Sequence, residues 1–265
     1  MAVSLLAITA AAQNPQGQNP PQKSAQEVAN EDPGVKKARA VLDQMIQALG
    51  GQALMNVQDM EQQGRSYGFY HGNPSGQGSL FWRFWKWPDK DRYELTKQRD
   101  VIIIYNGDQG WEITYKGTRA EDADEMKEYL RSREYSLNNV LRGWLKQADT
   151  ALFYEGTGLT QDKQVDKVTI INGKGDSETL FIDQLTHLPV KKSYFVRDPV
   201  SREKDEEAEV YDNWRNVQGI ATAHTTVLMH NGDITRQRFI QSVSYNQGLP
   251  DSNFTATATY VPKAK

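Results

Sequence analysis

The alternation of apolar and polar residues is the sequence feature that most restricts how this chain can fold. From about residue 59 onward, apolar side chains recur at every second position within short segments, which is the period of a β-strand. The pattern predicts twelve strands, at residues 59–71, 76–87, 90–98, 101–106, 109–116, 150–156, 165–172, 177–183, 188–197, 206–214, 219–229 and 233–245. Because tight turn sequences such as HGNP, NGD and NGKG join them, we expect an antiparallel meander without crossover helices.

Two helical segments accompany this β pattern, one before it and one within it. Residues 35–49 place their apolar side chains on one helical face, and Gly50 and Gly51 follow as a helix end. Residues 121–147 carry apolar side chains at helical intervals, and Ser136 is placed to cap a second helix within them. Because a sheet of about twelve strands curls, the two segments are expected to cover its concave side. The predicted fold class is mainly β with helical covers (α+β).

The N-terminal residues have a different composition from the rest of the chain. Residues 1–12 are apolar and end in three alanines, which fits a signal peptide, although the usual preceding basic residues are absent. The alternative is an apolar N-terminus without a signal function. Residues 13–33 have the Gln-, Asn- and Pro-rich composition of a linker. We therefore expect an exported, soluble protein with a folded domain at 34–255 and a tail at 256–265.

Composition excludes several classes of protein. The 265 residues carry a net charge of −3, so no basic excess is available for a nucleic-acid partner. No apolar run approaches the length of a membrane-spanning helix, and the mean hydropathy is −0.71. The chain has no cysteine, which excludes disulfides, thiolate metal sites and cysteine nucleophiles.

The residues that carry chemistry do not form a recognisable catalytic pattern. The four histidines, at 71, 187, 224 and 230, lack metal-ligand spacing, and no G-x-S-x-G sequence is present. The acidic run at 202–209 reads as a solvated loop between strands. We expect no catalytic residue, no metal and no cofactor, and therefore a protein that is not an enzyme.

Aromatic and aliphatic side chains gather instead on the strands. The stretch SLFWRFWKWPDK (79–90) is apolar on both strand faces, so both faces need a cover. A strand adds about 4.8 Å of width and a helix about 10 Å, so the helical segments cover about half of the sheet. The uncovered half leaves two interpretations open, a packed core or a ligand cavity. For a cavity, we place Trp82, Phe84, Trp111, Ile113 and Tyr115 on the sheet side and Met126, Leu130, Leu141 and Trp144 on the lid side.

Five stretches, in order, resemble a family of periplasmic carriers. They are ALGGQALMNVQDM (48–60), LFWRFWKWPDKDRYEL (80–95), YNGDQGWEI (105–113), TLFIDQLTHLPVKKSY (179–194) and VQGIATAHTTVLMHNGDITRQRFIQSVSYNQGLPDSNF (217–254). Together they are similar to the LolA-like outer-membrane lipoprotein-sorting proteins. The resemblance implies an unclosed antiparallel β-barrel of about 11–12 strands with helices in its mouth.

The resemblance also implies a function. It indicates a periplasmic, monomeric carrier that holds lipoprotein acyl chains or lipid, with envelope membrane proteins as further partners. Arg83 and Arg92 are candidates for the arginine that contacts the lid helices in that family. A non-catalytic envelope module with a filled barrel and an exposed edge strand is the alternative, and an envelope hydrolase is a more distant one.

Overall fold

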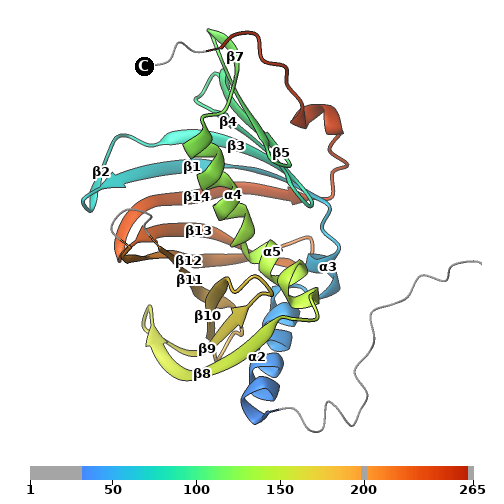
Figure 1. Ribbon diagram of the computed structural model, residues 1–265, viewed down its shortest axis with the longest axis vertical. Helices are drawn as coiled ribbons and strands as arrows, with labels where there is room; N and C mark the ends of the chain where they lie inside the picture. Colours follow the sequence, from blue (N-terminus) through green and yellow to red (C-terminus); the bar gives the residue numbers. More distant parts are fainter. Residues whose placement is uncertain (1–31, 198–201, 262–265) are drawn as a thin grey trace, which may run out of the picture. The chain divides into compact units, whose positions relative to one another are not determined.

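One antiparallel sheet dominates the computed structural model, which describes residues 32–197 and 202–261 (Figure 1). Fourteen strands of the described chain belong to it. They are β1 (Asp59–Tyr70), β2 (Asn73–Pro74), β3 (Ser79–Lys86), β4 (Lys90–Leu95), β5 (Val101–Asn106), β6 (Gln109–Thr114), β7 (Gly117–Ala120), β8 (Ala151–Thr160), β9 (Lys163–Ile171), β10 (Ser177–Asp183), β11 (Pro189–Arg197), β12 (Lys204–Val217), β13 (Ile220–His230) and β14 (Asp233–Tyr245). All twelve predicted strands are present; β2 and β7 are additional and too short to give a periodic signal.

The strand order leaves the sheet open. It runs β7-β6-β5-β4-β3-β1-β14-β13-β12-β11-β10-β9-β8, with β2 paired to β1 alone. The first long strand and the last therefore pair in the middle of the sheet, while β7 and β8, from the middle of the chain, form its two edges. Because these edges do not pair with each other, the predicted unclosed antiparallel sheet with helical covers is confirmed.

The helices lie where the sequence places them. They are α2 (Pro33–Leu49), the short α3 (Gln52–Met55), α4 (Ala123–Glu134), α5 (Leu137–Arg142) and a 3-10 turn at Trp144–Lys146. Gly50 and Gly51 have φ angles of 126° and 54°, which explains why α2 stops there. The predicted break at Ser136 is confirmed, since its hydroxyl accepts a hydrogen bond from the Asn139 amide at 3.3 Å.

The largest core lies between α2, α5 and strands β8–β10. Leu42 and Met45 of α2 pack there with Leu141, Trp144 and Leu180, all of them almost without solvent exposure. In Figure 1, α2 lies at the end of the sheet that β8, β9 and β10 form, and α4 runs across the sheet from the β7 side towards α5. The connection between the two open edges therefore passes over one face of the sheet.

The C-terminal segment covers part of the opposite face. Residues 246–254 end in a 3-10 turn (Asp251–Phe254), and Leu249 and Phe254 bury Ile104 of β5 in a separate cluster. The Asp59 carboxylate holds this segment, because it accepts the backbone amides of Gln247, Gly248 and Leu249 at 2.6–3.0 Å. The sequence indicated that both faces of these strands need a cover; this non-helical segment is the second cover.

Gly34–Lys265 form one compact unit. The predicted signal peptide and most of the predicted linker fall on residues 1–31, which lie outside the described residues, as do 198–201 and 262–265. None of the helices that the structure describes is both long and apolar enough to cross a bilayer.

Candidate functional site

The face of the sheet that α4 crosses is the candidate site, and we call it the inner face. It is identified by Tyr105 of β5, whose ring stacks on the Tyr129 ring of α4 with 3.5 Å between centroids. Met126 lies on the same side, because a Cβ added at Gly110 would come within 3.0 Å of its sulfur. Successive strand residues point to opposite faces, so Ile104 marks the outer face, under the C-terminal segment.

The structure divides the predicted strand residues from the predicted helix residues. Phe84, Trp111 and Ile113 pack around Ile104 on the outer face, and Trp82 shares their parity, with the Arg99 guanidinium 5.0 Å from its ring. Tyr115 lies in the turn after β6 and is 91% exposed. The five residues were expected to face the helices, but four of them lie on the outer face and Tyr115 lies in an exposed turn. When a strand is apolar on both faces, alternation alone does not predict which face the helix covers.

The four predicted helix residues also separate into two pairs. Met126 and Leu130 belong to α4 and are only partly buried. Leu141 and Trp144 are 2% and 1% exposed and belong to the main core with α2. The Trp144 indole donates a hydrogen bond to the Glu134 carboxylate at 3.0 Å, which fixes the junction after α4. Met126 and Leu130 thus lie on the helix that crosses the inner face, whereas Leu141 and Trp144 belong to the core that follows it.

Helix α4 lies on the sheet without being packed into it. None of its side chains is fully buried. Besides the tyrosine stack, Arg133 donates to the Gly107 carbonyl at 2.6 Å. Few buried apolar contacts and a small number of polar tethers are the properties of a segment that opens at low free-energy cost.

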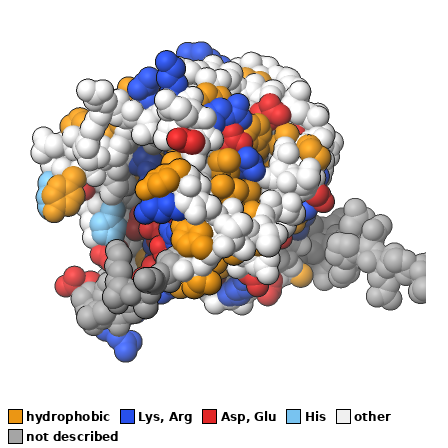
Figure 2. Space-filling model, turned by 90° about the horizontal axis from the view of Figure 1, so that it is seen from above, with side chains coloured by type: hydrophobic (Ala, Val, Ile, Leu, Met, Phe, Trp, Pro, Cys, Tyr) orange, Lys and Arg blue, Asp and Glu red, His pale blue; other side chains and the backbone are white. Residues whose placement is uncertain are grey.

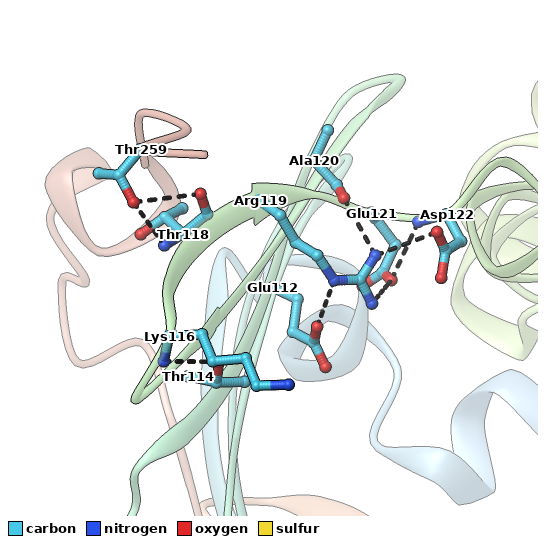
Figure 3. Close-up of polar contacts among 9 residues, drawn as sticks. All are labelled: Glu112, Thr114, Lys116, Thr118, Arg119, Ala120, Glu121, Asp122 and Thr259. Atoms are coloured by element: carbon cyan, nitrogen blue, oxygen red, sulfur yellow. Dashed lines mark hydrogen bonds and ion pairs between the residues drawn. The ribbon is translucent and has the colours of Figure 1, made fainter. Parts of the chain in front are cut away.

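A cluster of ion pairs around Arg119 joins the start of α4 to the edge strand β7 (Figure 3). Arg119 bonds Glu112 at 2.5 Å and Asp122, the residue before α4, at 3.1 Å. On the other side of β7, the Thr259 amide donates to the Thr118 carbonyl at 2.7 Å, so the C-terminal segment protects this edge. The first end of α4 is therefore anchored, and α5 in the main core anchors the other.

The inner face under α4 is polar as well as aromatic. Arg83 pairs with Tyr93 across β3 and β4, and Tyr93 pairs with Ile103 of β5. Because Ile103 is two residues before Tyr105, all three point to the inner face. Arg83 forms a two-pronged ion pair with Asp91, 2.7 Å at its shortest. Arg92, the other candidate for the cavity arginine, is on the outer face and donates to the Asn253 carbonyl at 3.1 Å. Burial raises the pKa of Tyr93, so its phenol stays protonated.

Two further arginines continue the inner face onto β14. Arg236 pairs with Gly68 of β1 and Arg238 with Ser66, the strand positions that share the face of Arg83. Arg236 is exposed to solvent, yet desolvation by the surrounding protein and the charge of Arg238 lower its pKa. A side chain that water reaches while protein surrounds it lies in a hollow. Figure 2 shows a recess on one face of the molecule, with basic and acidic side chains along it.

Small residues on β1 leave room for this hollow. The inner positions of β1 beside the arginines are Gly64, Ser66 and Gly68. A Cβ at Gly64 would lie 2.4 Å from the Phe239 carbonyl oxygen and 3.0 Å from the Phe81 ring, so the strands approach too closely for any larger side chain. The floor between Phe81 and Arg238 is consequently backbone and hydroxyl rather than bulky side chain.

Beyond the arginines, the same face carries a buried ion pair. Glu178 and Lys192 are 3.3 Å apart, and both are almost inaccessible to water. The Lys192 ammonium also donates to the Tyr135 carbonyl, while Tyr135 stacks on Tyr194. Burial outweighs the attraction to Lys192 and raises the pKa of Glu178 to about 7.

The histidines do not form a metal site. His224 is buried and bonds the Thr222 carbonyl, and His230 pairs with Glu207 at 2.9 Å, which raises its pKa. Within the described parts of the chain, no group of three or more His, Asp or Glu side chains is placed to hold a metal ion.

The sequence interpretation missed Tyr129, Arg236 and Arg238. The two arginines stand at alternate positions of the segment DITRQRFIQ, and a pair of like charges on one strand face was the available signal. The aromatic stretch at 79–90 drew attention to the opposite face.

Solved structures share this fold. A DUF1329-family protein of Desulfovibrio piger superposes with a TM-score of 0.58 at 12% identity, over 82% of this chain and 97% of that one. A LolA-superfamily protein of Nitrosomonas europaea gives 0.52 at 13% identity, over 83% of this chain and 97% of that chain. A putative outer-membrane lipoprotein-sorting domain of Vibrio parahaemolyticus gives 0.52 at 10% identity, with the same coverage. The resemblance to LolA-like proteins is thus confirmed as a likeness of fold. No protein-family model matches the chain, and a search of curated proteins found no relative.

Proposed function

We propose that this protein is an exported, non-catalytic carrier that holds a lipid or lipoprotein acyl chain between the inner face and α4. The observation that supports it best is the mounting of α4, which is anchored at both ends and has no fully buried side chain. A helix placed in this way over an open sheet is suited to move aside for a ligand. The shared fold with LolA-superfamily and lipoprotein-sorting structures agrees with this function.

The ligand would replace the contacts that α4 makes in the closed form. Met126, Tyr129 and Leu130 supply the lid surface, with the Tyr105 ring opposite them. Burying a methylene group contributes about 0.8 kcal/mol. A chain of ten methylenes therefore gains roughly 8 kcal/mol, from which the cost of displacing the tyrosine stack and ordering the chain is subtracted. Because about 8 kcal/mol corresponds to a Kd of about 1 μM before these costs, a chain of ten methylenes is expected to bind more weakly than that, and longer acyl chains more tightly.

Native mass spectrometry combined with organic extraction tests the proposal. The full chain, purified from the periplasm of a Gram-negative host, is expected to carry an acylated molecule or to take up a fluorescent fatty acid. The Tyr129→Ala variant removes the stack and is expected to release the probe several-fold faster. Tyr129→Phe keeps the ring and serves as the matched control. An apo mass together with no uptake of the fatty acid by the wild type would refute the carrier function.

One observation favours a second candidate function, a binding module for an extended peptide. Strand β8 is an open edge of ten residues that pairs only with β9, and it carries one charged residue, Glu155. Phe153 and Leu159 on it are 48% and 67% exposed. Long edges without charged or proline residues are suited to strand addition. An apo protein that protects β8 amides from exchange when a partner binds would support this candidate over the carrier.

A further inference from the structure

The inner face contains two arginines, Arg236 and Arg238, that form no ion pair with another described residue. Arg236 and Arg238 are alternate residues of β14, so their Cβ atoms are about 7 Å apart on the same face. Within the described residues neither guanidinium makes a hydrogen bond or an ion pair. This contrasts with Arg83 on the same face, which Asp91 neutralises.

Arg236 is exposed to solvent and Arg238 is half-buried, and the strands on both sides place uncharged residues next to them. Their cross-strand neighbours on β1 are Gly68 and Ser66, and on β13 they are Leu228 and Thr226. None of these four neighbours carries an opposite charge, and the Ser75 hydroxyl, 2.7 Å from the position of a Cβ at Gly68, occupies part of the space beside Arg236. The acidic side chains that act on Arg236 electrostatically are Glu125 and Glu128 of α4, and Glu128 is already paired with Arg131.

An unpaired pair of cations in a hollow is costly unless something binds there. Desolvation and the charge of Arg238 lower the pKa of Arg236, so the free protein maintains the Arg236 charge at a cost in stability. Arginine presents a planar fork that matches the two oxygens of a phosphate or carboxylate, and such charge-assisted bonds are about twice as strong as neutral ones.

We infer that Arg236 and Arg238 bind the oxyanion of the carried ligand, a phosphate or carboxylate, with the apolar chain running towards Tyr105 and Tyr129. This inference rests on the proposed carrier function and deepens it: the ligand is an anionic amphiphile rather than a neutral one. The adjacent small residues of β1 admit the head group, and the aromatic side chains of β5 and α4 hold the tail.

Calorimetric titration of the full chain with three probes tests the inference. The probes are dodecyl phosphate below its micelle concentration, dodecanol and inorganic phosphate. The wild type is expected to bind dodecyl phosphate at least tenfold more tightly than dodecanol. The Arg236→Gln/Arg238→Gln variant is expected to lose this preference and to retain its affinity for dodecanol. Arg65→Gln, which removes the same charge from the outer face of the neighbouring strand, is expected to keep the preference.

The outcomes separate the inference from the carrier function. Equal wild-type affinities for dodecyl phosphate and dodecanol, or a preference that survives the double substitution, would overturn the oxyanion site and leave the carrier intact. If inorganic phosphate binds through both arginines while neither alkyl probe binds, the site takes a free anion and the carrier function is wrong. If none of the probes binds, both are wrong. The melting temperature of the double variant should equal or exceed that of the wild type, because two repelling charges are removed.

Discussion

The buried carboxyl of Glu178 should make the stability of the protein fall as the pH rises through neutrality. The side chain is fully buried and one of its oxygens lacks a hydrogen-bond partner. Among the residues that the structure describes, its counter-charge is Lys192, at 3.3 Å. Desolvation therefore favours the neutral acid and raises the pKa from its usual 4.5 to about 7. Because the folded state holds the proton more tightly than the unfolded state, this contribution is present below pH 4.5 and is lost as the pH rises to 7.

The size of the effect follows from the two pKa values. Each unit of pKa difference corresponds to about 1.4 kcal/mol. With a folded pKa of about 7 and an unfolded pKa of 4.5, most of the loss falls between pH 5 and pH 8. The free energy of unfolding should decrease by about 2 to 3 kcal/mol over that interval because of this residue.

Urea unfolding of the wild type and Glu178→Gln at pH 5 and pH 8 measures this change in the free energy of unfolding. Glutamine resembles the protonated acid, so the two proteins should be similar in stability at pH 5 and differ at pH 8, with the wild type the less stable. Glu206→Gln is the control, because its half-exposed carboxylate pairs with Lys191 at 2.9 Å and its pKa is lowered. Parallel changes in the wild type and Glu178→Gln between pH 5 and pH 8 would show that Glu178 is ionised in the fold, and the reasoning from burial would be wrong.

Three other substitutions test how the covers of the sheet are held, each by denaturant unfolding. Asp59→Ala leaves three backbone amides of the C-terminal segment without their acceptor and should cost about 3 kcal/mol or more, and a loss below 1 kcal/mol would mean that water replaces the carboxylate. Arg142→Ala removes a buried guanidinium that lies 4.0 Å from the Trp87 ring centroid and donates to the Val57 carbonyl at 2.7 Å. We expect the free energy of unfolding to fall by about 2 to 4 kcal/mol. Unchanged stability would show that the desolvation of Arg142 cancels these contacts. Gly64→Ala should cost about 1 to 3 kcal/mol through the clash with the Phe239 carbonyl, whereas Gly72→Ala, at a turn with open space, should cost only what its φ of 74° imposes.

The sequence was sufficient to predict where the strands and helices lie, but not which face of each strand is covered by the helices. Periods of two and 3.6 residues place nearly every strand and helix, and Ser136 and Gly50 mark helix boundaries that the structure confirms. The paired strands β3 to β6 are apolar on both sides, so the pattern carries no information about which side the helices cover. The cover of the outer face is a segment without periodicity, held by one carboxylate, Asp59, from the far end of the chain. Such long-range contacts leave no local signal.

The same limitation explains why the polar character of the inner face was missed. Aromatic density directs attention to Trp82 and Phe84, which belong to the outer core side of β3, whereas Arg236 and Arg238 look like ordinary exposed strand charges in the sequence. Only the register of β1 with β14 brings them to the face that α4 crosses.

The mixture of charges and rings on the inner face bears on the kind of ligand that fits. A site for a purely apolar molecule gains nothing from cations, because each one that loses water without a partner opposes binding. Arg83 has Asp91 as its partner, and Lys192 has Glu178. Arg236 and Arg238 have no ion-pair partner among the described residues. A lid that carries Glu125 and Glu128 towards them offers a weak internal counter-charge that an incoming oxyanion displaces at little cost. If the proposed carrier function holds, release of such a ligand is coupled to return of the acidic helix α4, so the charge of the ligand would influence the position of α4.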